Sequence, residues 1–214
     1  MIKLQKLGGS AAIAEALIYI AMFIFYGALW DFPHEASVVQ KLAFLSENKL
    51  SLSIMNFIGY VLFGVLLAIL VQSLYSKLDG NQRPLIQTAT IFGLIWVCII
   101  ISGGMIANLG LQSIIDLSIT EPEHARAVWL ANNIVVEGLG GGIEIVGGLW
   151  MFFLCVDTVK SGGLPRGLSV LGLLIGTAGI LTIYPADILT EIFGIGQIVW
   201  FIWLGIFMLG ITKS

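Results

Sequence analysis

The chain has 214 residues, of which 58% are hydrophobic and 11% charged, and its mean hydropathy is +1.00. A soluble domain is nearer half apolar and a quarter charged, so this composition excludes an ordinary soluble protein and indicates one whose solvent is the lipid bilayer. The formal net charge of -3 and the scattered Lys and Arg residues leave no basic patch, which excludes a nucleic-acid partner.

Apolar runs along the chain predict an all-α polytopic membrane protein, a single domain built as a bundle of six transmembrane helices. A helix of about 20 apolar residues crosses roughly 30 Å of hydrocarbon, and within lipid a helix pairs its own backbone groups. The first run follows Lys3 and Lys6 but contains no signal-peptide cleavage site, so we expect it to be retained. The expected spans cover residues 8–30, 50–75, 84–109, 127–156, 167–185 and 192–212.

The basic residues predict the orientation of this bundle. Positively charged residues remain in the cytoplasm, and most of those in this chain fall on one side of the expected spans. We therefore expect both termini in the cytoplasm and the protein in a bacterial cytoplasmic membrane. The expected cytoplasmic set is Lys3, Lys6, Lys77, Arg83, Lys160, Arg166 and Lys213, and the expected outer set is Lys41, Lys49 and Arg126.

The two longer outer loops carry helix signals. Apolar residues recur at helical spacing between Ser37 and Glu47, which predicts a short helix on the outer surface. In the second loop, Thr120 and Glu123 match a capping box that contains Pro122 in the first turn. We therefore expect the fourth helix to begin near Glu121, before it enters the membrane.

The fourth expected span carries an unusual polar stripe. At 3.6 residues per turn, one face of a continuous helix would collect amide, acidic and glycine residues while the other faces remain apolar. The stripe consists of Asn133, Glu137, Gly140, Gly141, Glu144 and Gly148.

The glycines of this span have a packing interpretation. Small residues four apart let two membrane helices approach closely, as Gly138 with Gly142 and, on the fifth span, Gly172 with Gly176 would do. Each Glu would then be protonated and hydrogen-bonded across the helix contact. Under this interpretation the helix-packing residues are Gly138, Gly140, Gly141, Gly142, Gly172 and Gly176.

The acids have a functional interpretation as well. A charged carboxylate at the bilayer centre costs at least about 2.5 kcal/mol, and such residues usually mark an ion, proton or ligand path. Glu15 adds a third acid to Glu137 and Glu144, and no Lys or Arg lies within a span to pair with them. We therefore expect protonated acids, a bound cation, or hydrogen bonds to an amide such as that of Asn133.

Metal and cofactor sites are not predicted. A di-iron bundle needs Glu-x-x-His on facing helices, whereas His34 and His124 fall in outer loops. Cys98 and Cys155 lie in apolar runs without metal-ligand spacing, and no nucleotide-binding or hydrolase motif occurs. We expect no cofactor, and an enzymatic role is less expected than a non-enzymatic one.

The run from Trp129 to Trp150, followed by Leu164, Pro165, Arg166 and a glycine-rich fifth span, resembles a bacterial family of small multi-pass membrane proteins classed as a domain of unknown function. The resemblance implies the fold and the membrane placement, and it implies no activity.

Three functional hypotheses follow from the buried acids. The first is transport of protons, cations or a small solute, with Glu137, Glu144 and Asn133 in the binding site and Glu15 as an inner relay. The second is an accessory subunit of a membrane complex, whose stripe packs against partner helices. The third is a membrane enzyme that acts on a lipid or a quinone. The expected partners are membrane lipids, together with a proton, a cation, a small apolar ligand or other membrane subunits.

Overall fold

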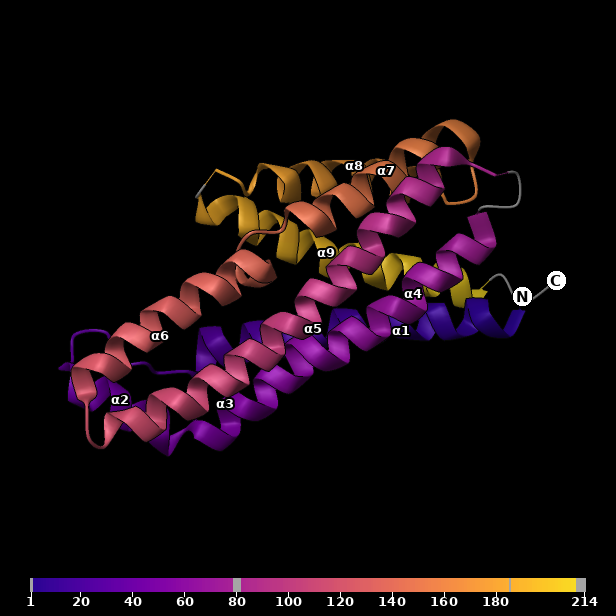
Figure 1. Ribbon diagram of the computed structural model, residues 1–214. Coiled ribbons are helices and arrows are strands. Elements are labelled where there is room, and N and C mark those ends of the chain that lie inside the picture. The colour runs from indigo at the N-terminus through magenta and orange to yellow at the C-terminus, as the bar shows by residue number, and fades with distance from the viewer. Residues whose placement is uncertain (1, 79–81, 185, 211–214) are drawn as a thin grey trace.

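The computed structural model describes residues 2–78, 82–184 and 186–210 (Figure 1). Every regular element in these ranges is a helix, which confirms the all-α class. Short π-helical segments (η) continue or join several α-helices. The elements are α1 (Ile2–Ile24), η1 (Phe25–Leu29), α2 (Val38–Glu47), α3 (Lys49–Asn56), η2 (Phe57–Leu62), α4 (Phe63–Leu78), α5 (Pro84–Ser118), α6 (Pro122–Val136), η3 (Glu137–Gly141), α7 (Ile145–Ser161), α8 (Arg166–Leu181) and α9 (Asp187–Gly210).

Five helical stretches in the described ranges are long and apolar enough to cross a membrane, which is what an integral membrane protein requires. They are Lys3–Leu29, Lys49–Leu78, Pro84–Ser118, Pro122–Ser161 and Asp187–Gly210. The fifth span expected from the sequence corresponds to α8, an apolar helix of 16 residues. At 1.5 Å per residue α8 is about 24 Å long, shorter than the roughly 30 Å of hydrocarbon.

The helices run back and forth between the two ends of one elongated bundle (Figure 1). α1 begins, α4 ends, α5 begins and α9 ends at the same end, where α7 also turns into α8. The opposite end contains α2, α3 and α6. We refer to these as the terminal end and the loop end of the bundle.

Two separate cores stabilise the bundle. The larger core, toward the terminal end, is built around fully buried indole rings, with the ring centroids of Trp96 and Trp150 5.7 Å apart and those of Trp150 and Trp200 5.8 Å apart. The smaller core, at the loop end, contains Leu42, Leu45, Leu52, Leu111, Ile114, Ile115 and Ala125. The 35-residue α5 contributes to both cores, so it holds the loop end at a fixed position relative to the rest.

Glycines bring α7 and α8 close together. A Cβ added at Gly148 would lie 2.8 Å from the carbonyl oxygen of Gly176, and one added at Gly176 would lie 2.8 Å from the amide nitrogen of Phe152. Backbone therefore packs directly on backbone, which a larger residue would prevent. Gly172 lies in the same interface, where an added Cβ would be 2.3 Å from the Cys155 sulfur.

Helix starts at the loop end differ in part from expectation. The short outer helix is present as α2, and Ser37 forms a capping box with Gln40, which accounts for its start. The capping box expected at Thr120 is wrong, because Glu121 is the N-cap residue of α6 and no side-chain cap bond forms there. Pro122 does occupy the first turn, as expected.

Candidate functional site

The fourth expected span is broken at the stripe of acids and glycines. α6 ends at Val136 and α7 begins at Ile145, and between them Gly140 adopts a φ of 104°, outside the helical region. This left-handed conformation suits glycine, because it has no Cβ to clash with the backbone. The expectation of one continuous helix with a single polar face is therefore wrong, and the segment 137–144 is a connection between two half-helices.

Neighbouring helices fix the backbone of this broken segment. The Glu144 amide donates to the Thr182 hydroxyl at 2.8 Å, and the Thr190 hydroxyl donates to the Gly142 carbonyl at 3.0 Å. The amides of Gly142 and Ile143 both donate to the Glu137 carbonyl at 3.2 Å. The bonds to Thr182, the C-cap residue of α8, and from Thr190 of α9 replace part of the helical ladder that the break removes, which a buried segment requires.

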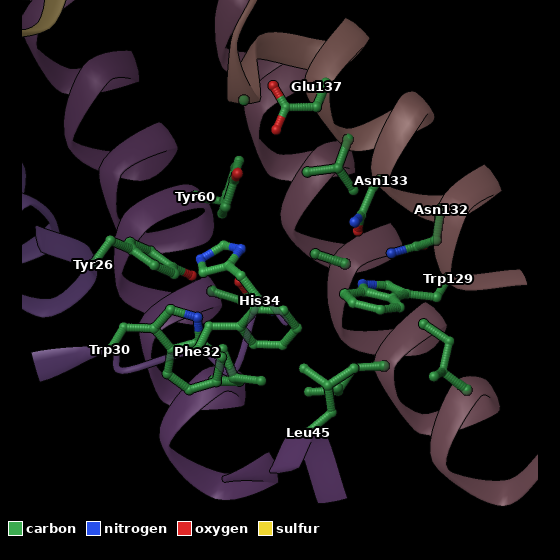
Figure 2. Close-up of a pocket in the computed structure, with 17 residues that line it drawn as sticks. Tyr26, Trp30, Phe32, His34, Leu45, Tyr60, Trp129, Asn132, Asn133 and Glu137 are labelled. Atoms are coloured by element: carbon green, nitrogen blue, oxygen red, sulfur yellow. The ribbon is translucent and has the colours of Figure 1, made fainter. Parts of the chain in front are cut away.

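An outer cavity of about 520 Å³ opens beside the break, at the loop end of the bundle (Figure 2). Glu137 lies at one end of it, and its carboxylate is turned toward the side of the cavity where Tyr60 lies. Asn132 and Asn133 follow along the α6 wall. The other labelled residues of the lining are Tyr26, Trp30, Phe32, His34, Leu45 and Trp129.

A smaller, inner cavity of about 130 Å³ adjoins the outer one. Tyr60 and Gly141 line both cavities, so these two residues form the boundary between them. Glu144 lines the inner cavity and is only 7% exposed. Tyr19 lines it from α1, one helical turn after Glu15.

Glu15 lies next to this inner cavity but is sealed from it. Its side chain is fully buried, and neither carboxylate oxygen has a hydrogen-bond partner among the described residues. Gln197 of α9 is also fully buried, and its amide atoms likewise have no partner in the described ranges. An ionised carboxylate in such surroundings is costly, which favours the neutral acid in this conformation.

Asparagine side chains in and around the outer cavity divide into two groups. Asn133 lines the outer cavity beside Glu137, as a binding residue would. Asn56 instead donates to the side-chain oxygen of Asn108 at 3.1 Å, and Asn108 donates to the Ser53 carbonyl at 3.3 Å. This pair links α3, which precedes η2, to α5, and it makes no hydrogen bond to an acid among the described residues.

The glycines of the broken segment serve the site more than they serve helix packing. No atom lies within 4 Å of the position that a Cβ on Gly138 would take. A Cβ on Gly142 would lie 2.2 Å from a carboxylate oxygen of Glu137, so this glycine makes room for the acid. Gly141 has the Tyr60 hydroxyl 3.3 Å from its own Cβ position, at the boundary of the two cavities.

Several lining residues carried no signal in the sequence. Tyr60 and Tyr19 lie in apolar runs, and their place beside the acids depends on contacts between distant helices. His34 is exposed and lies in a loop, as expected, and its ring also lines the outer cavity between Tyr26 and Trp129 (Figure 2). His124 is exposed and pairs with Glu121.

The site has no arrangement typical of a metal centre within the residues the structure describes. No three or more His, Cys, Asp and Glu side chains come together there in a way that could hold a metal ion. The chemistry available is that of carboxyl, phenol, amide and imidazole groups, which exchange protons and bind polar or cationic ligands. Comparison with protein-family models, curated proteins and solved structures finds no match to this chain.

Proposed function

We propose that this chain crosses the bacterial cytoplasmic membrane six times and carries protons, or a small solute together with protons, by way of Glu137 and Glu144. Support for six crossings comes from α8, which packs antiparallel along α7, and from the common end of the bundle at which α1 begins and α9 ends (Figure 1). A short helix such as α8 can cross where the bilayer thins locally.

The proposed orientation rests on the same geometry. Residues near the terminal end include Lys3, Lys6, Lys77, Arg83 and Lys160, and positive charge is retained in the cytoplasm. The terminal end is then cytoplasmic, and the outer cavity opens toward the extracytoplasmic side.

One observation carries the transport proposal: the two cavities meet where the fourth span is broken, and each contains one of the acids. Carriers commonly bind their substrates at discontinuous helices, whose unwound backbone and helix ends line the site. Non-helical backbone is tolerated at membrane depth where it is buried in protein or lines a water-filled cavity. Both conditions apply to segment 137–144, which α8 and α9 support and which both cavities border.

The positions of the acids suggest the order in which they would pass a proton. Glu137 is exposed in the outer cavity and exchanges protons with the outer solution. Glu144 receives the proton at the boundary formed by Tyr60, which lines the cavities of both acids. Glu15 is sealed in this conformation, so release toward the cytoplasm requires α1 to move relative to its neighbours. In this proposal, the conformation described is the outward-open state of the carrier.

Proton uptake by liposomes that contain the purified protein and an internal pH-sensitive dye tests the proposal. We expect uptake driven by a membrane potential in the native protein, and at least a roughly tenfold loss in Glu144→Gln and in Glu137→Gln. Glu123→Gln is the matched control, because it removes the same charge from exposed α6 surface outside the cavities. Uptake by both cavity variants at the native rate, with unfolding midpoints unchanged, contradicts the proposal.

A further inference from the structure

We infer that the outer cavity is a binding site for a small organic monocation, such as a quaternary or substituted ammonium ion, held between aromatic rings and the Glu137 carboxylate. As a statement about binding, this inference depends only on the lining of the cavity. As a statement about what is carried, it rests on the proposed function.

Aromatic rings form one continuous wall of this cavity. Trp30 and Phe32 stack with their centroids 6.3 Å apart, and Phe32 meets Trp129 edge to face at 5.7 Å. Tyr26 contacts Trp30 at 6.4 Å. These contacts join the chain after α1 to α6, so the rings hold one another in position before any ligand arrives. The face of such a ring attracts a cation through its quadrupole.

With His34 neutral, the charge of the lining has a single sign. Glu137 is the only Asp or Glu among the 17 residues that line the cavity, and none of them is Lys or Arg. Its carboxylate is exposed within the cavity, at the opposite end from the ring of Trp30 (Figure 2). An anionic ligand would meet this carboxylate without a compensating cation, whereas a monocation is attracted by both the acid and the rings.

The remaining polar groups fit a ligand with one charged and one apolar part. The cavity volume of about 520 Å³ falls in the range of small-molecule sites, roughly 300 to 1,000 Å³. The side chains of Asn132 and Asn133 line the α6 wall near Glu137 and can bond polar groups of a ligand. Leu45, Leu52 and Leu111 line the rest of the site with apolar surface. A simple metal cation would leave most of this apolar and aromatic surface unused.

Binding of benzyltrimethylammonium to the purified protein, measured by isothermal titration calorimetry, tests the inference. We expect saturable binding of this cation and none of 2-methyl-1-phenyl-2-propanol, a neutral molecule of nearly the same shape. Glu137→Gln should weaken binding at least roughly tenfold, because it removes the only acid of the lining. Glu123→Gln, on the exposed surface of α6 and outside the cavity, should leave the affinity unchanged.

Two variants of Trp129 test the contribution of the aromatic wall. Trp129→Leu should weaken binding roughly fivefold, and Trp129→Phe should restore most of the loss, because it retains a ring face. Equal affinity for the cation and the neutral molecule, or native affinity in Glu137→Gln, overturns the inference.

Two further experiments identify the source of the cation and separate this inference from the transport proposal. An ethanolamine headgroup of a lipid has the same ammonium chemistry, so titrations in nanodiscs with and without phosphatidylethanolamine show whether a headgroup competes for the cavity. Cation binding without proton uptake, whether or not the cation is present in the liposome assay, keeps this site and refutes the transport proposal. Proton uptake without cation binding keeps the transport proposal and refutes this site.

Discussion

Gly142 lies directly against the Glu137 carboxylate, with its Cβ position 2.2 Å from one of the acid's oxygens. Its φ of -143° is accessible to any residue, so Gly142→Ala should fold normally and displace only the flexible end of Glu137. We expect a loss of proton uptake and of cation affinity, with a change in unfolding free energy below about 0.5 kcal/mol. Gly138→Ala is the matched control, since nothing lies near its Cβ position. A Gly142→Ala variant with native uptake and affinity would argue against a role for the Glu137 carboxylate.

Arg83 and Asp157 form a largely buried ion pair at the terminal end of the bundle, and Arg83 also donates to the carbonyls of Leu78 and Gly162. Removal of one partner of a buried pair leaves the other charge uncompensated. We expect Asp157→Asn to lower the unfolding free energy by about 3 kcal/mol in a detergent denaturation series. The exposed pair of Glu123 and Arg126 provides the comparison, where Glu123→Gln should cost less than about 0.5 kcal/mol. Equal costs at the two sites would show that burial does not control the strength of the pair.

At the residue scale, the sequence indicated which acids to examine but not what surrounds them. Glu137, Glu144 and Glu15 are conspicuous because acids are rare in apolar spans. Tyr60 and His34 are not, because an aromatic residue in a span or a histidine in a loop has many possible positions. Their place at the site depends on contacts between segments distant in sequence, which residue type and periodicity do not encode.

The close packing of α7 on α8 can be tested with a single glycine substitution. A Cβ on Gly148 would meet the amide nitrogen of Ile180 at 2.6 Å, and backbone atoms cannot rotate away as a side chain can. Gly148→Ala should therefore separate the two helices and lower the unfolding free energy by about 1 to 3 kcal/mol. Gly27→Ala serves as the control, because its Cβ position is open. A stability equal to that of the control would mean that the two helices do not need this close contact.

Sequence periodicity located the helices better than it located their interruption. The presence of α2 and the approximate positions of the apolar helices follow from periodicity and composition, which are local properties, but α5 ends at Ser118 and not at the expected residue 109. The break at 137–144 competes with a glycine pattern that also fits a continuous packed helix. Bonds from Thr182 and Thr190 stabilise the broken form, and they lie about 40 to 50 residues further along the chain. Local sequence therefore gave no means to choose between the two forms.

For the whole molecule, the six-crossing topology predicts that both termini lie on one side of the membrane. Without a crossing by α8, the five remaining spans would place the termini on opposite sides. Fluorescent-protein fusions that mature only in the cytoplasm should therefore fluoresce at either terminus. A fusion that fluoresces at only one terminus would refute the six-crossing arrangement and leave the five long helices as the spans.

Transport by way of Glu144 requires the two cavities to connect at Tyr60 and Gly141, the residues that line both, so that the outer solution reaches position 144. Reaction of Glu144→Cys with a membrane-impermeant thiol reagent, in a background without Cys98 and Cys155, tests this junction directly. We expect reaction when the reagent is added to the outer side, and no reaction for Glu15→Cys, which is sealed. An unreactive cysteine at position 144 in a protein that folds normally, or one that reacts only from the cytoplasmic side, would contradict the account.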